Sequence, residues 1–224
     1  MENSDLRKGA PMPTRHIFRK IVVCMLMDLL LYAVCAATLA AAEGERTLFD
    51  FGDSQTAAQW RSINDDVMGG RSEGTSRIIK QGLFVFSGNL SLENRGGFAS
   101  VRCRPTKLDL SAFEAIVLRV RGDGRTYYCN LHTPTRRTAF SHRAAFATKA
   151  NEWRDIRIPI KNFHPAAYGR RLPREALLDP GRVQSLGFTI ADKKAGPFTL
   201  EIDWIKVVPP QAQENDAKAA SATQ

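Results

Sequence analysis

Apolar residues recur at every second position over several short stretches of the sequence, and this alternation sharply limits the folds open to the chain. Polar or charged residues fill most of the positions between them in 115–121, 154–160 and 198–204. The apolar sets are Ile116, Leu118 and Val120; Ile156, Ile158 and Ile160; and Phe198, Leu200, Ile202 and Trp204. Successive side chains of a β-strand point to opposite faces. The pattern therefore predicts half-buried strands whose apolar sets, Trp204 included, face a core.

Turn-forming residues separate these stretches. The chain contains 16 glycines and 11 prolines, and short alternating segments between Gly, Pro, Asn and Asp clusters are typical of an all-β sandwich or barrel. Strands and helices do not alternate along the sequence, which argues against a doubly wound nucleotide-binding fold. A composition of 43% hydrophobic and 25% charged residues is that of a globular protein. We expect one all-β domain over 47–208, a two-sheet β-sandwich.

Both ends of the chain are expected to lie outside this domain. Basic residues precede an apolar run over 21–39, and alanines follow at 40–42. This pattern predicts a secretory signal peptide over 1–42. The alternative is an uncleaved N-terminal membrane anchor, because 21–42 is long enough to span a bilayer. Either alternative predicts an exported protein, periplasmic or extracytoplasmic. The polar, alanine-rich residues 209–224 predict a disordered tail.

Two cysteines lie beyond the apolar run, at Cys103 and Cys129. Both fall on the apolar face of an alternating stretch, which predicts a pair of buried small hydrophobic residues. Export would also permit one disulfide between them, provided that their strands are neighbours. The sequence leaves these two alternatives open.

Polar residues and glycines are densest in two stretches. The first, at 60–74, contains an Asn-Asp-Asp cluster before a Gly-Gly pair, and the second, at 87–102, repeats the theme with Glu-Asn-Arg-Gly-Gly. Adjacent glycines permit positive φ angles and close backbone approach. The carboxylates and amides offer acceptors for a ligand, and the alternative is a pair of turns whose polar groups satisfy their own backbone. The residues expected to bind a ligand or partner are Trp60, Asn64, Asp65, Asp66, Met68, Gly69, Gly70, Glu93, Asn94, Gly96 and Gly97.

Patterns for catalysis are weak in this chain. Residues 70–74 match G-x-S-x-G around Ser72, but a strand-like stretch follows where a nucleophile elbow needs a helix. Asp65 and Asp66 are adjacent, so in an extended backbone they point apart and make a poor acid–base pair. The histidines lack zinc-site spacing. We therefore expect no catalytic residue, no metal and no cofactor.

The formal net charge of +9 raises the question of an anionic partner. Basic residues gather at 136–143 and at 170–174, near aromatic residues. An exported protein rarely meets nucleic acid, so no nucleic-acid partner is expected. The alternatives are attraction to anionic lipid headgroups or acidic polymers, and arginines that are solvated on strand edges and loops.

Five segments carry a specific resemblance when they are taken together and in order. They are WRSINDDVMGGRSEG, FSGNLSLENRGGFASVR, LRVRGDGRTYYCNL, EWRDIRIPIKNF and GPFTLEIDWIKV. From about residue 47 to 207 the chain resembles the complex I intermediate-associated protein 30 family. The resemblance implies a galactose-binding-like jelly roll, a fold that carbohydrate-binding modules share. It also implies a function, since the mitochondrial members of the family are assembly factors that bind intermediates of respiratory complex I and perform no chemistry.

We therefore expect a non-enzymatic binding domain that acts through protein interaction at a membrane, with a respiratory assembly as the partner that the resemblance implies. The alternative is an exported carbohydrate-binding module. Sandwich modules bind glycans by stacking aromatic rings on the sugar, and the candidate rings here are Trp60, Tyr128 and Trp153. The glycan hypothesis requires these rings to line one exposed surface, whereas a protein-binding domain has no such requirement.

Overall fold

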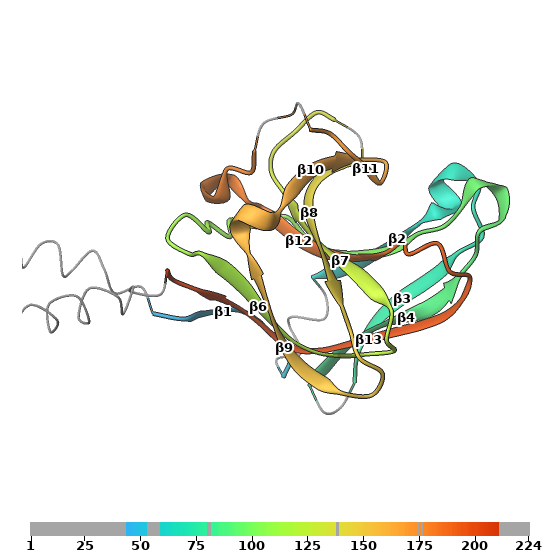
Figure 1. Ribbon diagram of the computed structural model, residues 1–224, viewed down its shortest axis with the longest axis horizontal. Coiled ribbons are helices and arrows are strands. Elements are labelled where there is room, and N and C mark those ends of the chain that lie inside the picture. Colours follow the sequence, from blue (N-terminus) through green and yellow to red (C-terminus); the bar gives the residue numbers. More distant parts are fainter. Residues whose placement is uncertain are drawn as a thin grey trace, which may run out of the picture. The chain divides into compact units, whose positions relative to one another are not determined.

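The computed structural model describes residues 44–52, 59–79, 82–137, 139–173, 175 and 177–210. The expected leader at 1–42 and most of the expected tail at 209–224 lie outside these residues. No helix in the described part is long and apolar enough to cross a membrane. The described residues form two antiparallel β-sheets, shown in Figure 1. This architecture confirms the expected all-β sandwich.

The first sheet has six strands in the order β3-β4-β13-β6-β9, with β1 also paired to β13. Its strands are β1 (Arg46–Asp50), β3 (Glu73–Ile79), β4 (Leu83–Leu90), β6 (Ala115–Gly122), β9 (Trp153–Pro159) and β13 (Gly196–Val208). The second sheet has seven strands in the order β11-β10-β8-β7-β12-β5-β2. Its strands are β2 (Trp60–Asn64), β5 (Ala99–Cys103), β7 (Thr126–His132), β8 (Phe140–Ala147), β10 (His164–Ala167), β11 (Arg170–Arg171) and β12 (Ser185–Ile190).

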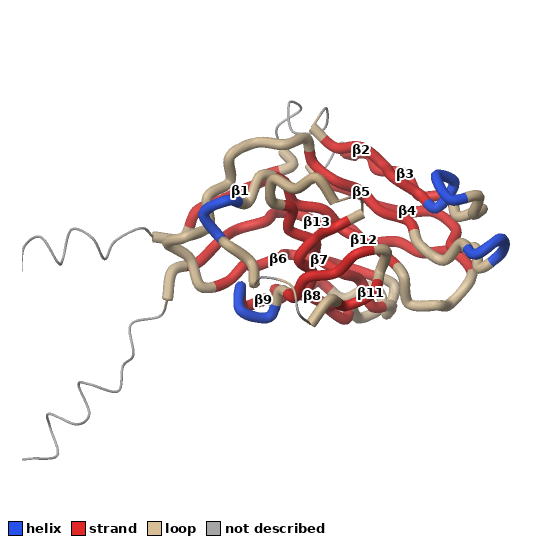
Figure 2. The backbone as a smooth tube through the Cα atoms, turned by 90° about the horizontal axis from the view of Figure 1, so that it is seen from above, coloured by secondary structure: helices blue, strands red, loops and turns tan. Residues whose placement is uncertain are grey.

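Four short 3-10 helices join the strands, and they are drawn in blue in Figure 2. They are η1 (Asp65–Met68), η2 (Glu93–Arg95), η3 (Ile160–Asn162) and η4 (Pro180–Arg182). The core fills the space between the inner faces of the sheets, where Trp60 of β2 and Phe84 of β4 bring aromatic rings of both sheets together, with centroids 4.6 Å apart. Further aromatic rings pack against a neighbour in the same sheet. Phe86 of β4 and Phe198 of β13 pack edge to face, with ring centroids 4.9 Å apart. Phe188 of β12 and Phe146 of β8 do the same at 6.2 Å. Burial of such rings is the main favourable contribution to folding.

Strand β13 contains an irregularity that the alternating pattern did not reveal. Its register with β6 shifts between Ile202 and Trp204. An extra residue in one strand reverses the alternation of faces beyond it. Ile205 and Val207 are consequently buried, whereas Trp204 is only half-buried with the Lys206 ammonium 4.5 Å from its ring centroid. The expectation that Trp204 faces the core is wrong.

The two cysteines are free and buried. Cys103 lies on β5 and Cys129 on β7, and β12 pairs with both of these strands and separates them. Adjacent strands are about 4.8 Å apart, so residues two strands away are about 10 Å apart, beyond the reach of a disulfide. Burial raises the pKa of the Cys129 thiol. The interpretation as buried small hydrophobic residues is therefore confirmed, and the disulfide alternative does not apply.

Candidate functional site

Two turns from different parts of the sequence meet at one end of the sandwich. Helix η1 follows β2, and η2 follows β4. Strand β2 ends opposite the start of β5, with Asn64 paired to Ala99, and β3 begins opposite the end of β4, with Glu73 paired to Asn89. This strand pairing brings both turns to the same end, as Figure 1 shows in cyan and green. We call residues 65–70 and 91–97 together the double turn.

The Asp65 carboxylate joins the two parts of the double turn. Its Oδ1 accepts a hydrogen bond from the Ser72 backbone amide at 2.8 Å. Its Oδ2 accepts from the Ser72 hydroxyl at 2.6 Å and from the backbone amides of Gly97 at 2.6 Å and Phe98 at 3.2 Å. The Asp65 side chain is fully buried. A single carboxylate therefore fastens η1 to the segment that follows η2.

These hydrogen bonds keep Asp65 ionised. Burial alone would raise its pKa, because desolvation disfavours the charged form. The hydrogen bond from the Ser72 hydroxyl and those from the backbone amides of Gly97, Ser72 and Phe98 outweigh burial and hold the pKa of Asp65 below its ordinary value. The buried charge is thus stabilised locally, and its acceptor positions are occupied by donors of the protein itself.

Two glycines leave room for this carboxylate. A Cβ atom on Gly70 would lie 2.3 Å from Asp65 Cγ, and one on Gly96 would lie 2.6 Å from Asp65 Oδ2. Both distances are too short for any side chain. One glycine of each Gly-Gly pair, Gly70 and Gly96, is therefore required by the close approach of the turns to Asp65, whereas Gly69 and Gly97 have positive φ angles of 85 and 123. Asn94 within η2 has φ 52, a left-handed conformation that asparagine tolerates better than most residues.

Ser72 forms a second connection between the turns. Its hydroxyl donates to Asp65 Oδ2 and accepts a hydrogen bond from the Ser91 backbone amide at 3.0 Å. Ser72 is buried, and strand β3 begins at the next residue, Glu73. No helix follows it as a nucleophile elbow requires. Its role in the described structure is to hold the double turn together, a role that the sequence did not suggest.

The outer surface of the double turn is exposed and partly apolar. Val67, Met68 and Leu92 are 69%, 48% and 48% exposed. Arg71 Nη1 and Glu93 Oε2 form an ion pair of 2.8 Å on the same surface, and this pair again links the two turns. Of the residues predicted from sequence, nine lie within the double turn: Asp65, Asp66, Met68, Gly69, Gly70, Glu93, Asn94, Gly96 and Gly97. Val67 and Leu92 were not among the residues predicted to bind a partner. The signal that identifies them is an apolar residue within a polar turn, where the side chain is expected to be exposed.

Asn64 and Trp60 have different positions. Asn64 directly precedes the double turn, and its side-chain amide donates a hydrogen bond to the Gly74 carbonyl at 3.0 Å. Trp60 is buried in the core, where its ring centroid lies 4.6 Å from that of Phe84 and 6.0 Å from that of Phe188. The structure therefore separates Trp60 from the double turn. The reason is the pairing of Trp60 with the buried Cys103, which places both on the inner face.

The three rings of the glycan hypothesis do not share a surface. Trp60 is in the core, and Tyr128 lies on the outer face of the second sheet with the Arg143 guanidinium 4.2 Å from its ring centroid. Trp153 is on β9 of the first sheet, where the guanidinium groups of Arg119 and Arg121 lie 5.7 and 5.0 Å from its ring centroid. No stacking platform combines these three rings. Within the described residues, no group of three His, Cys, Asp or Glu side chains is arranged to hold a metal ion.

Comparison with known sequences agrees with the resemblance. The family model "Complex I intermediate-associated protein 30" matches residues 49–202. Among curated proteins, "Complex I intermediate-associated protein 30, mitochondrial" of Drosophila melanogaster is 29% identical over 180 residues, which cover 70% of this chain and 61% of the relative. The mouse protein of the same name is 29% identical over 185 residues, which cover 74% and 56%. The match thus leaves a large part of each relative without a counterpart in this chain.

Comparison with solved structures agrees with the fold. A Family 11 Carbohydrate-Binding Module of Clostridium thermocellum aligns with a TM-score of 0.58 at 19% identity, over 77% of this chain and 99% of the module. A Family 30 Carbohydrate Binding Module aligns with a TM-score of 0.50 at 14% identity, over 78% and 93%. At such low identity the similarity extends to the sandwich fold alone.

The names of the curated relatives correct one expectation. The fly, mouse and Neurospora crassa relatives are named mitochondrial, which contradicts the predicted export to a periplasmic or extracytoplasmic location. That prediction rested on the apolar run within 1–42, which lies outside the described residues. An apolar run of this length establishes only that a segment is able to enter a bilayer. It does not specify which membrane receives the segment.

Proposed function

Since this chain belongs to the family of Complex I intermediate-associated protein 30, we propose that it is a non-enzymatic assembly factor that binds a protein intermediate of respiratory complex I. The double turn is the observation that carries this proposal. It offers an exposed surface of Val67, Met68 and Leu92 on a backbone that buried hydrogen bonds hold fixed.

The chemistry of the double turn suits a protein partner. Exposed apolar residues that gather in one place mark interaction sites, and methionine is enriched at protein interfaces. A surface that is ordered before binding also loses less conformational entropy when the partner arrives. Asp65 and Ser72 supply this order, because they join the two turns through four hydrogen bonds to the carboxylate and one to the hydroxyl.

The same contacts support a role without catalysis. A general base needs an accessible lone pair and a pKa near the working pH. Asp65 is buried, its acceptors are engaged and its pKa is lowered. The Ser72 hydroxyl is buried between Asp65 and Ser91. The groups that most resemble catalytic residues in the sequence are thus used to build the binding surface.

The structure offers no specific support for the glycan alternative. Similarity to carbohydrate-binding modules extends to the fold, and fold alone does not define function. The three candidate rings lie in the core and on two different sheets.

Affinity capture tests the proposal. The tagged full chain is recovered from its native membranes in mild detergent, and the proteins that accompany it are identified by mass spectrometry. We expect complex I subunits with the wild type and at least tenfold less of them with the double variant Val67→Glu/Leu92→Glu. The matched control is Leu177→Glu, because Leu177 is 82% exposed and lies outside the double turn. Absence of complex I subunits from the wild-type sample, or equal recovery with the double variant, would contradict the proposal.

A further inference from the structure

A row of directly opposed residues, four of them basic, crosses the second sheet from β2 to β10. The strand register places six residues directly opposite one another, strand by strand, from β2 through β5, β12, β7 and β8 to β10. They are Arg61, Arg102, Gly187, Asn130, Arg143 and His164. Directly opposed residues of an antiparallel pair project from the same face. We call this set the arginine row.

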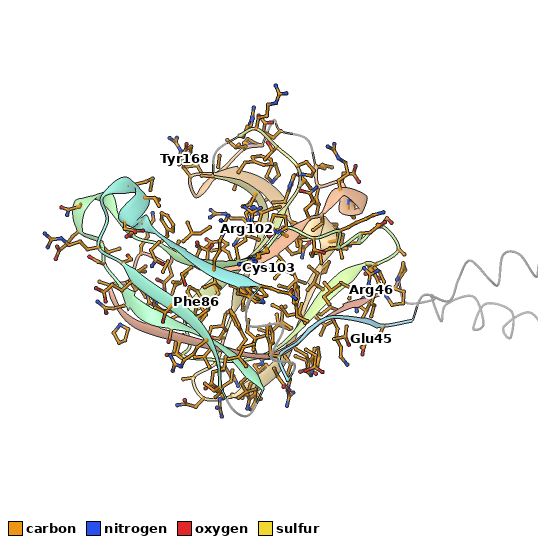
Figure 3. The ribbon with its side chains drawn as sticks, turned by 180° about the vertical axis from the view of Figure 1, so that it is seen from behind. Glu45, Arg46, Phe86, Arg102, Cys103 and Tyr168 are labelled. Carbon is orange, nitrogen blue, oxygen red and sulfur yellow. The ribbon has the colours of Figure 1, made fainter. Side chains whose placement is uncertain are left out.

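The arginine row lies on the face of the sheet that points away from the core. Residues at the alternate positions, such as Val101, Cys129 and Phe188, are buried between the sheets, so the row projects outward. Figure 3 shows Arg102 on the side of its strand toward Tyr168, and Cys103 on the side of the core. Arg61 is exposed and Arg102 and Arg143 are half-buried, so the three arginines are accessible from outside the sandwich, whereas Gly187 and Asn130 between them are buried.

The arginines of the row lack carboxylate partners among the described residues. Arg102 Nε donates to the Ser185 hydroxyl at 2.9 Å. Arg143 donates to the Gly169 carbonyl, lies over the Tyr128 ring and keeps a buried Nε without a hydrogen-bond partner in the described part of the chain. The Arg61 side chain has no hydrogen bond or ion pair within the described residues.

On the first sheet, by contrast, several arginines form ion pairs with carboxylates. Arg119 pairs with Asp155 at 2.9 Å, and Arg121 pairs with Glu201. Arg125, in the connection between β6 and β7, also binds Asp192 through two nitrogen atoms. Arg46 and Arg77 of the first sheet donate to backbone carbonyls and to the Ser87 hydroxyl instead, but neither of them faces another arginine across a strand pair. The unneutralised row on the second sheet is a local departure that calls for an anionic partner.

The charges of the row also oppose one another. Arg61 and Arg102 face each other directly across the β2–β5 pair, and like charges in this position destabilise a sheet. Burial and then the charge of Arg61 lower the pKa of Arg102, and burial lowers the pKa of Arg143. An external anion would relieve both the repulsion and the incomplete solvation of these groups.

The centre of the row holds no bulky side chain. Gly187 lies between Arg102 and Asn130, and a Cβ atom there would lie 2.4 Å from the Val101 carbonyl oxygen. The Asn130 side chain is held by a hydrogen bond from its Nδ2 to Thr189 Oγ1 at 2.9 Å and one from the Ser141 hydroxyl at 3.2 Å. The arginines therefore stand on both sides of a low, preorganised centre.

We propose that the arginine row docks an acidic protein segment, whose carboxylates pair with Arg61, Arg102 and Arg143. The inference rests on the proposed function, because it assigns the partner a carboxylate-rich segment in addition to the surface that meets the double turn. The planar guanidinium group matches a carboxylate with two parallel hydrogen bonds. Five strand-to-strand steps of about 4.8 Å make the row about 24 Å long, a distance that an extended segment of about seven residues spans.

Direct binding to a defined probe tests this inference. The probe is a fluorescently labelled peptide of alternating Glu and Gly, and anisotropy reports its affinity for the full chain at low salt. We expect a tenfold or greater loss of affinity for Arg102→Gln and for Arg143→Gln, with partial recovery in Arg102→Lys. The matched control, Arg119→Gln, removes the same charge from an ion pair on the other sheet and is expected to change the affinity less than twofold.

Several outcomes would overturn the inference. They are no binding of the peptide by the wild type, an equal loss with Arg119→Gln, and tighter binding to a single-stranded oligonucleotide or to phosphatidylglycerol vesicles than to the peptide. Thermal unfolding of each variant shows whether it is folded. The double variant Val67→Glu/Leu92→Glu is expected to bind the peptide with wild-type affinity. Recovery of complex I subunits in the affinity capture therefore tests the double turn, and peptide binding tests the arginine row, independently of each other.

Discussion

The Ser72 hydroxyl donates to Asp65 Oδ2 at 2.6 Å, and the two residues are seven positions apart in the sequence. This hydrogen bond closes the loop that contains η1. The same Asp65 oxygen accepts from the Gly97 amide, so the loop after β2 and the loop after β4 share one acceptor. Changes at Asp65 are therefore expected to affect both loops at once.

Replacement of Asp65 by asparagine tests this coupling. Three donors converge on Asp65 Oδ2, and the Ser72 backbone amide donates to Oδ1. An asparagine side chain has a single oxygen, so it accepts either from the three donors or from the Ser72 amide, but not from both. Leaving buried donors unsatisfied costs about 1–3 kcal/mol each, so we expect Asp65→Asn to lower the free energy of unfolding by about 3 kcal/mol in urea titration. The control is Asp66→Asn, because Asp66 is exposed. Equal stability of the two variants would show that the carboxylate does not hold the turns.

The glycines against Asp65 give a second prediction. Gly70→Ala and Gly96→Ala each place a Cβ atom within 2.6 Å of the carboxylate. Overpacking of this kind costs about 1–3 kcal/mol, and we expect that loss in the free energy of unfolding, measured by chemical denaturation. Gly44→Ala is the control, since nothing lies within 4 Å of its added Cβ atom. If all three variants unfolded at the same denaturant concentration, the close approach would be refuted.

His132 gives a prediction for pH. Burial, followed by the charge of Arg102, lowers the pKa of His132 to about 3, whereas its unfolded value is about 6.5. Between these values the unfolded chain binds a proton that the folded chain does not, so stability falls as the pH falls. One pKa unit corresponds to about 1.4 kcal/mol, and we expect a loss of about 3 kcal/mol between pH 7 and pH 4 from this group.

The variant His132→Asn isolates that contribution. Unfolding curves of the wild type and the variant are compared at pH 7 and pH 4, and the variant is expected to lose less stability on acidification. His164 is half-buried, and partial burial lowers its pKa, so the variant retains part of the pH dependence. Parallel pH profiles for both proteins would mean that His132 is protonated in the folded state.

The opposed arginines give a prediction for stability in the absence of a partner. Arg61 faces Arg102 across the β2–β5 pair and is exposed. Removal of one of two like charges in this position stabilises the folded state by about 0.2–1 kcal/mol. We therefore expect Arg61→Gln to raise the free energy of unfolding at low salt and to raise it less at high salt. A decrease would show that Arg61 contributes to folding. Arg77→Gln, on the exposed face of β3, serves as the control.

Much of the fold follows from the alternation of residues. The stretch at 115–121 lies within β6, and all but the last residue of 154–160 lies within β9, because their alternating apolar residues occupy one face; Ile160 already belongs to η3. The bulge in β13 was not predictable, since an inserted residue changes the face of Trp204 without changing the local composition. Trp60 was assigned to the binding site because polar residues follow it in the sequence. Its pairing with the buried Cys103 places it on the inner face of the sheet instead.

The candidate site was predictable only as separate parts. Local sequence shows that glycines follow both polar clusters, but it does not show that Gly70 and Gly96 approach the same carboxylate. The arginine row was invisible for a related reason. Its members come from strands that are adjacent in the sheet and distant in the sequence, and β12 enters between β5 and β7 from near the C-terminus. Only the tertiary register aligns them.

The position of β12 between β5 and β7 has a consequence for where such a domain is able to work. Because it keeps Cys103 and Cys129 apart and both thiols are buried, the described fold has no disulfide for an oxidant to form or a reductant to break. Thiolates rather than thiols are the reactive species, and burial disfavours the thiolate of Cys129. The described sandwich is thus held together without a disulfide, so its folding requires no oxidising compartment.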